Sequence, residues 1–155
     1  MFSNELVCDI LVYLNKDINK EISIDELSSL FHYDKTYLMK RFKRELNITI
    51  FDYINSKRIY NSLSYYNYDN YIISIGFNNG FNSLEYYSEM FKKIIGVSPI
   101  IYKRFIDRNV GITIDEINTI LNSVNRLKLL DDKITKYINN RKPSTTMVKA
   151  IVFKK

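Results

Sequence analysis

The sequence predicts an all-α fold of two helix-turn-helix subdomains joined by a long linker helix, followed by a helical tail and a short C-terminal strand. The main observation is an internal repeat: residues 34–51 recur as residues 83–100 at an offset of 49 positions, which aligns Tyr37 with Tyr86. Apolar residues recur every three or four positions, as they do on one face of an amphipathic helix. Residues that favour N-caps precede these stretches, and Asn or Gly follows them. A duplicated helical unit that carries basic residues indicates a nucleic-acid partner.

Length and composition restrict the class of protein. The 155 residues are 46% hydrophobic and 14% aromatic, enough for one domain or for a small domain with an appendage. No apolar run approaches the roughly 18 residues of a membrane span, and the N-terminus lacks the pattern of a signal peptide. The single cysteine, Cys8, excludes an internal disulfide and suits a reducing compartment. We therefore expect a cytoplasmic protein with no membrane partner.

The net charge of +6 is unevenly distributed along the chain. Residues 1–106 contain 13 Lys and Arg against 12 Asp and Glu, whereas residues 107–155 contain 10 against 5. We expect the first range to be the double helix-turn-helix domain and the second to be a helical extension. Because the first range is nearly neutral, any affinity for phosphates must come from local clusters of basic residues.

Two helices precede the helix of the first repeated unit. Residues 4–17 place their apolar side chains on one stripe. Ser23-x-x-Glu26 is a capping box, which opens a short helix that ends at Phe31. A tight turn then leads to Asp34, the expected N-cap of the next helix.

That next helix, residues 35–46, has a buried and an exposed side. Leu38, Phe42 and Leu46 are spaced by four residues and form the buried stripe. Basic residues gather on the rest of the helix, and three of them are candidates for contacts with DNA phosphates: Lys35, Lys43 and Arg44. A solvated helical face is the ordinary interpretation of such a run. Its place in the second helix of a helix-turn-helix favours DNA.

The first turns of the exposed side carry candidates for base reading. In a major groove, Lys40 can reach guanine O6 and N7, while Met39 and the Thr36 methyl group suit a thymine methyl. For Met39, an ordinary exposed apolar side chain is the alternative.

Residues 49–66 are expected to form a longer helix between the two units. Their spacing places four apolar residues on one inward side: Phe51, Ile54, Ile59 and Leu63. A helix of this length acts as a rigid spacer.

A shorter helix at residues 71–77 opens the second unit, with Asn70 as its N-cap. Three isoleucines are expected to pack inward: Ile72, Ile73 and Ile75. Gly76, inside this helix, costs about 1 kcal/mol relative to Ala, which indicates that another helix passes close by.

The second copy of the unit contains a helix at residues 84–95 that Ser83 caps and Gly96 ends. Its inward residues have the same spacing as those of the first copy: Tyr87, Phe91 and Ile95. Pro99 prevents continuation of this helix.

The tail predicts further helices. Thr113-x-x-Glu116 is another capping box. The apolar stripe after it contains Ile117, Ile120, Leu121, Val124 and Leu127. A second helix is expected to restart at Asp131 and Asp132.

Residues 139–146 break the helical pattern, and residues 147–153 alternate as a short strand does. Because a lone strand is unstable, it either pairs with a segment outside this chain or begins a further domain of a longer protein. The helical part, residues 113–138, is expected to dock on the DNA-binding domain or to mediate self-association. Simple packing against residues 4–17 is the alternative.

The second unit resembles the signature of AraC/XylS-type transcription regulators. The resemblance covers roughly residues 5–106, and it rests on fixed spacing between Gly80-Phe81, Phe91-Lys92-Lys93, Gly96, Pro99 and Tyr102. The first copy is similar to the upstream half of that domain. Members of this family have seven helices and set two recognition helices into successive major-groove segments of one DNA duplex. The resemblance therefore implies double-stranded DNA as the partner, with RNA polymerase as a further one.

The resemblance also implies which residues read bases. In the first unit they are Thr36, Met39 and Lys40; in the second they are Leu84, Glu85, Ser88 and Glu89. Lys92 and Lys93 remain available for phosphates. Glu85 or Glu89 can accept a hydrogen bond from cytosine N4, but two carboxylates facing DNA also repel its phosphates. We expect the first unit to carry most of the specificity and the second to position or to bind weakly.

An enzyme is the class that the sequence supports least. One His and one Cys, His32 and Cys8, provide no metal set, and we find no nucleophile–base pair or glycine-rich phosphate loop. We expect no catalytic residue, metal or cofactor. The near-neutral charge of residues 1–106, together with Glu85 and Glu89, supports one alternative function, a protein-interaction module that keeps the fold with weak or lost DNA binding.

Overall fold

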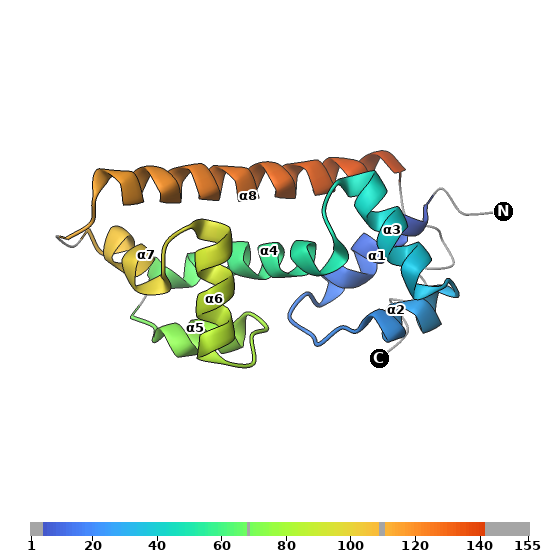
Figure 1. The fold of residues 1–155 in the computed structure, drawn as a ribbon, viewed down its shortest axis with the longest axis horizontal. Helices are drawn as coiled ribbons and strands as arrows, with labels where there is room; N and C mark the ends of the chain where they lie inside the picture. The colour runs from blue at the N-terminus through green and yellow to red at the C-terminus, as the bar shows by residue number, and fades with distance from the viewer. Residues whose placement is uncertain (1–4, 68, 109–110, 142–155) are drawn as a thin grey trace. The chain divides into compact units, whose positions relative to one another are not determined.

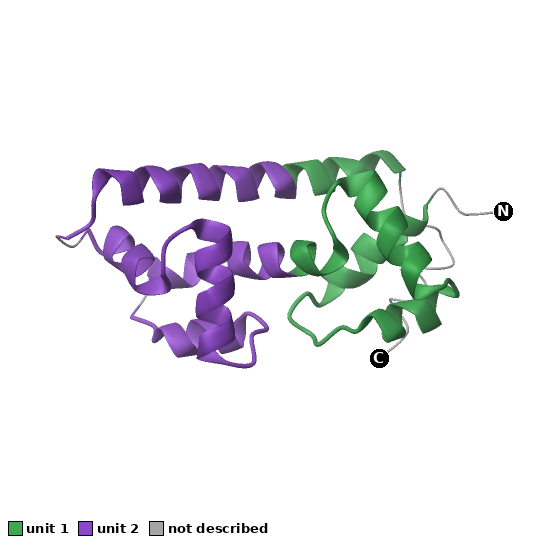
Figure 2. Ribbon diagram, viewed as in Figure 1, with its two compact units in different colours: residues 1–54, 132–155 green, residues 55–131 purple. Residues whose placement is uncertain are grey.

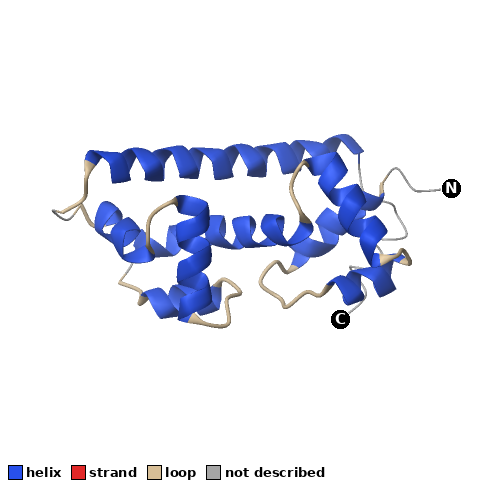
Figure 3. Ribbon diagram, in the orientation of Figure 1, coloured by secondary structure: helices blue, strands red, loops and turns tan. Residues whose placement is uncertain are grey.

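The computed structural model describes residues 5–67, 69–108 and 111–141, which lie in helices, turns and loops (Figure 3). In chain order the helices are α1 (Leu6–Lys16), α2 (Ile24–Phe31), α3 (Lys35–Leu46), α4 (Ile50–Ser62), the 3-10 helix η1 (Leu63–Asn67), α5 (Ile72–Asn78), α6 (Leu84–Ile95), α7 (Pro99–Ile106) and α8 (Ile114–Arg141) (Figure 1). The predicted all-α class is confirmed. The predicted strand at residues 147–153 lies outside the described residues.

The chain divides into two compact units (Figure 2). Unit 1 comprises residues 1–54 and 132–155, and unit 2 comprises residues 55–131. Each unit contains one helix-turn-helix, α2 with α3 in unit 1 and α5 with α6 in unit 2. The helices α4 and α8 contribute residues to both units. The predicted domain boundary at residue 106 stays a prediction.

Unit 1 has an apolar core in which the first three helices and the end of α8 take part. Leu38, Phe42 and Leu46 are almost fully buried, as the stripe on α3 predicts. The ring of Phe42 lies 6.1 Å from that of Tyr53 in α4. In α8, Ile134 is 3% exposed, and the Tyr137 hydroxyl donates to the Glu45 carboxylate of α3. The end of α8, from residue 132, therefore belongs to unit 1.

Unit 2 has an aromatic core. The hydroxyl groups of Tyr66 and Tyr87 lie 2.7 Å apart, and the Ser62 hydroxyl lies 3.0 Å from that of Tyr87. The predicted close approach at Gly76 is confirmed, because a Cβ atom there would lie 3.0 Å from the Tyr87 ring. Ile120 of α8 is fully buried in this core.

The repeated helices begin and end as their local sequence predicts. The Asp34 carboxylate accepts a hydrogen bond from the Thr36 N–H, and the Ser83 hydroxyl accepts one from the Tyr86 N–H. The residue after each helix, Asn47 or Gly96, has a φ of 57° or 94°. This left-handed conformation terminates a helix and favours glycine or asparagine.

Four details of the predicted helices were wrong. The linker helix does not continue to residue 66, because α4 ends at Ser62 and a 3-10 helix follows. Asn70 does not cap α5; its side-chain amide donates to the Tyr65 carbonyl oxygen. The tail helix does not restart at Asp131 and Asp132, since α8 is continuous. It also continues to Arg141, past the start of the predicted break at residue 139.

Three predicted inward residues are exposed. Phe51 is 39% exposed, Ile73 45% and Leu121 53%. Each lies at the edge of a correctly predicted stripe, where a helical period alone does not fix the width of the buried face.

Candidate nucleic-acid interface

The exposed side of α3 carries the three predicted base-reading residues of unit 1. Thr36, Met39 and Lys40 are all exposed, with 41% of Met39 accessible. They lie outside the buried stripe that anchors the helix to the core. A helix buried along one side presents the other side in a fixed orientation, which a base-reading surface requires.

The predicted phosphate contacts of unit 1 differ in their surroundings. Lys35, Lys43 and Arg44 are exposed. The Lys35 ammonium lies 2.5 Å from the Asp25 carboxylate, and this hydrogen bond raises the pKa of Lys35. To bind a phosphate, Lys35 has to give up this exposed ion pair, which contributes little to stability.

Arg41 belongs to the interior of unit 1 and not to its basic surface. Its guanidinium donates to the Glu45 carboxylate over 2.7 Å and to the Tyr37 hydroxyl over 2.9 Å. Only 8% of Arg41 is exposed. The hydrogen bond to Glu45 is the main reason why the pKa of Arg41 is raised. Its charge is thus compensated within the protein.

The exposed side of α6 has a different character. Leu84, Glu85 and Glu89 are exposed and Ser88 is half-buried, so all four predicted base-reading residues reach the surface. The predicted phosphate contacts Lys92 and Lys93 lie in its exposed last turn. Acidic residues therefore occupy the first half of α6, and basic residues occupy its end.

Tyr86 is a surface residue of α6 that the sequence analysis did not select. It is 44% exposed, and its hydroxyl accepts a hydrogen bond from the Asn55 side-chain amide over 3.1 Å. The repeat offset offered a signal, because Tyr86 corresponds to Tyr37 of α3. An aromatic side chain beside the predicted base-reading residues adds apolar contact area to this surface.

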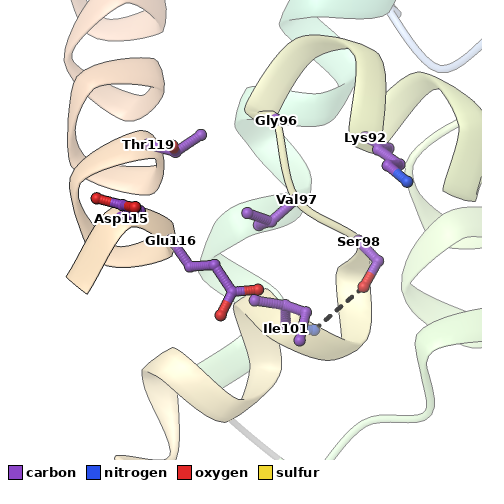
Figure 4. Close-up of a pocket in the computed structure, with 8 residues that line it drawn as sticks. All are labelled: Lys92, Gly96, Val97, Ser98, Ile101, Asp115, Glu116 and Thr119. Atoms are coloured by element: carbon purple, nitrogen blue, oxygen red, sulfur yellow. Dashed lines mark hydrogen bonds between the residues drawn. The ribbon is translucent and has the colours of Figure 1, made fainter. Parts of the chain in front are cut away.

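An open pocket of about 280 Å³ lies in unit 2 beside the end of α6 (Figure 4). Its lining contains Lys92 on one side and Asp115 and Glu116, in the first turn of α8, on the other. Glu116 is occupied in the predicted capping box, where it accepts from the Thr113 N–H over 2.9 Å. One ammonium opposite two carboxylates does not favour an anion, so we assign no phosphate to this pocket.

Three other kinds of chemistry concern the described residues: metal binding, the thiol of Cys8 and the imidazole of His32. Among them no three His, Cys, Asp or Glu side chains are grouped to hold a metal ion. Burial raises the pKa of Cys8 to about 11, with Asp9 adding to the effect, so at neutral pH it is a packed thiol. His32 is exposed and ends α2 in the left-handed conformation. No helix in the described part of the chain has the length and hydropathy to cross a membrane.

A family profile described as a helix-turn-helix domain matches residues 27–104, half of the chain. The matched segment begins in α2 and ends in α7. It therefore includes both helix-turn-helix pairs and the helix that follows the second.

Several curated proteins are similar to the same part of the chain. The HTH-type transcriptional activator AarP of Providencia stuartii is 24% identical over 103 residues, which cover 66% of this chain and 76% of AarP. The uncharacterized HTH-type transcriptional regulator YdiP of Escherichia coli (strain K12) is 27% identical over 100 residues, which cover 64% of this chain. This match spans only 33% of YdiP, so the relatives differ in what else they contain.

Two solved structures share the fold. The C-terminal domain of AraT, a response regulator from Geobacillus stearothermophilus, matches 68% of this chain and 88% of its own, with a TM-score of 0.61 and 23% identity. A protein of unknown function from Listeria innocua matches 63% of this chain and 93% of its own, with a TM-score of 0.58 and 23% identity. At this identity the likeness concerns the fold alone.

Proposed function

Because the chain belongs to the AraC/XylS-type helix-turn-helix family of DNA-binding transcription regulators, we propose that it recognises a specific duplex sequence with two recognition helices, α3 and α6. The observation that carries this proposal is the exposed part of α3, where Thr36, Met39 and Lys40 reach the surface while Leu38, Phe42 and Leu46 are buried. An α-helix presented in this way fits the major groove.

The two units contribute differently. In α3, Lys40 donates to guanine O6 and N7, and Met39 and Thr36 contact a thymine methyl. Lys43 and Arg44 contact phosphates, with Lys35 joining them when its ion pair with Asp25 opens. This basic, exposed surface carries most of the specificity.

In unit 2, Lys92 and Lys93 contact phosphates and hold α6 on the duplex. Glu85 and Glu89 either accept from cytosine N4 or keep the first half of α6 away from the backbone. Leu84 and Ser88 complete the surface that faces the groove. Unit 2 therefore contributes more to positioning the protein on the duplex than to selecting the DNA sequence.

One observation favours a second candidate function, a protein-interaction module with weak DNA binding. Unit 2 also exposes large apolar side chains, among them Tyr71, 80% exposed, and Phe77, 53% exposed. Such a surface suits a protein partner, and RNA polymerase is the partner expected of a transcription activator. Self-association through residues 113–138 is the other expectation, supported by Leu121 and Leu129 of α8, which are 53% and 58% exposed.

Selection of binding sites from random duplexes at moderate salt tests the proposed function. We expect one preferred sequence, and log K should fall against log salt with a slope of roughly −4 to −5 when about four to six phosphates are neutralised. A protein without sequence preference, recovered together with a partner protein, would support the interaction module instead.

Gel shifts with the selected site then test the role of α3. Lys40→Ala should weaken binding by about 1–3 kcal/mol and relax the preference at one base pair, whereas Lys43→Ala should weaken binding to all sequences alike. Lys128→Ala is the matched control, because Lys128 is an exposed lysine of α8, outside both recognition helices. Wild-type affinity of Lys40→Ala for the selected site contradicts the assignment.

A further inference from the structure

The last residue of each recognition helix is hydrogen-bonded by a side chain of α8. In unit 2, the Ser123 hydroxyl donates to the carbonyl oxygen of Ile95 over 2.6 Å. In unit 1, the Lys133 ammonium donates to the carbonyl oxygen of Leu46 over 2.9 Å. Leu46 and Ile95 end α3 and α6 and occupy the same position of the 49-residue repeat. Two different side chains of one helix therefore make the same contact in both copies.

The contact meets a requirement of every helix end, because the last four carbonyl groups have no partner within the helix. The turn after each helix provides one donor. The Asn47 N–H donates to the Lys43 carbonyl and the Gly96 N–H to the Lys92 carbonyl, each over 2.8 Å. The final carbonyl of each helix accepts from α8 instead, so the two ends are completed by a distant part of the sequence.

The packing around Ser123 leaves its hydroxyl little freedom. Ser123 is 2% exposed, and a buried hydroxyl without a hydrogen-bond partner is destabilising. One turn earlier in α8, Thr119 lies so close to Gly96 that a Cβ atom on the glycine would be 2.5 Å from the Thr119 methyl group. The end of α6 and this part of α8 are therefore closely fitted.

In unit 1, a series of side-chain hydrogen bonds connects α8 with residues along α3. Tyr137 of α8 donates to the Glu45 carboxylate, which also accepts from Arg41, and Arg41 donates to the Tyr37 hydroxyl. These contacts lead from the last turn of α3 back to its first, where Thr36 lies. The orientation of α3 is thus coupled to the position of α8.

We propose that Ser123 and Lys133 are positioning residues for DNA recognition, each holding one recognition helix at its C-terminal end. This inference rests on the proposed function. A base-reading side chain must be held within about 0.5 Å of its productive position. Each recognition helix has 12 residues, and such a helix is about 18 Å long, so a small tilt at its end displaces the residues of its first turns. Release of α8 therefore lowers the discrimination between sequences before it unfolds either unit.

Ser123→Ala and Lys133→Met, made in the full chain, test this inference against matched controls on the same helix. Asn122→Ala and Lys136→Met remove exposed polar side chains of the same helix near the two test positions. The ratio of affinities for the selected site and for a scrambled duplex should fall roughly 3- to 10-fold in each test variant, the effect of losing the hydrogen bond between α8 and the end of the recognition helix. The controls should keep the wild-type ratio, and Lys133→Arg, which retains a donor, should restore most of the loss.

Hydrogen exchange without DNA separates this inference from the proposed function. Amides in the last turns of α3 and α6 should exchange faster in Lys133→Met and Ser123→Ala, respectively. By reciprocal linkage, the selected duplex should slow exchange in α8 of the wild type. If the wild type selects a sequence and the folded test variants keep its affinity ratio, the positioning role is overturned alone. If the wild type selects no sequence, both proposals are overturned, whatever the exchange rates are.

Discussion

Tyr137, in α8, donates a hydrogen bond to the carboxylate of Glu45, in α3, across 92 positions of the sequence. Burial raises the pKa of Tyr137, and its hydrogen bond to Glu45 adds to this effect. Glu45 thereby serves two partners, since it also pairs with the buried Arg41. The helical tail is thus part of the charge network that keeps an arginine inside unit 1.

Removal of this one hydroxyl should destabilise the protein without breaking the Arg41–Glu45 pair. We expect Tyr137→Phe to lower the free energy of unfolding by about 1.5–3 kcal/mol, the range for a hydrogen bond to a charged group. Urea unfolding measures the change. Tyr71→Phe, at a tyrosine that is 80% exposed, should alter the value by less than about 0.5 kcal/mol. Equal effects of the two changes would show that the contact with Glu45 contributes nothing.

The close fit at Gly96 gives a second prediction. Gly96 and Gly111 both have a positive φ, 94° and 103°, but only Gly96 has a neighbour, Thr119, in the path of an added Cβ atom. Gly111→Ala should cost about 1–2 kcal/mol, because alanine is strained at a positive φ. Gly96→Ala should cost about 1–3 kcal/mol more, the typical penalty of overpacking. Thermal unfolding of both variants gives the difference, and Thr119→Ser should reduce it; an undiminished difference contradicts this explanation.

The sequence was most informative where structure depends on neighbouring residues. Ser83 and Gly96 define both ends of α6, since an N-cap hydroxyl and a left-handed glycine act within one turn. The buried stripes of α3 and α6 follow from spacing for the same reason. The exposure of Thr36, Met39 and Lys40 was therefore predictable from the sequence and is confirmed. Their contacts with bases remain untested predictions.

The sequence was least informative where structure depends on distant residues. Two adjacent aspartates suggested a break in the tail, but Asp131 forms an ion pair with Lys57 of α4 in unit 2 and the helix continues. The hydrogen bond from Ser123 to Ile95 has no local signature, because a helical serine can equally bond to its own helix. Leu121 was placed inward because its spacing fits the stripe, yet only the tertiary packing decides how wide that stripe is.

The acidic half of α6 should oppose DNA binding. Glu85→Gln with Glu89→Gln keeps the shape of both side chains and removes two negative charges from an exposed surface. We expect affinity for all duplexes to rise several-fold at low salt, and the gain to shrink as salt screens the charges. Gel shifts at two salt concentrations measure this effect. Glu21→Gln, an exposed acid outside the repeated helices, is the control. Loss of affinity for the selected site alone would show instead that one of the two acids reads cytosine.

The buried tyrosines of unit 2 should make the protein sensitive to alkali. Burial raises the pKa of Tyr102 to about 12 and raises those of Tyr66 and Tyr87 as well, from an ordinary value of 10.0. The unfolded chain therefore loses its phenolic protons first, so stability is fully present below pH 10 and falls as the pH rises from 10 towards 12. Urea unfolding between pH 8 and pH 11.5 should show this decline. It should be shallower in Tyr66→Phe, which has one fewer buried phenol, than in Tyr71→Phe. Parallel curves for the two variants would contradict the assignment, because Tyr71 is 80% exposed and does not belong to the buried tyrosines.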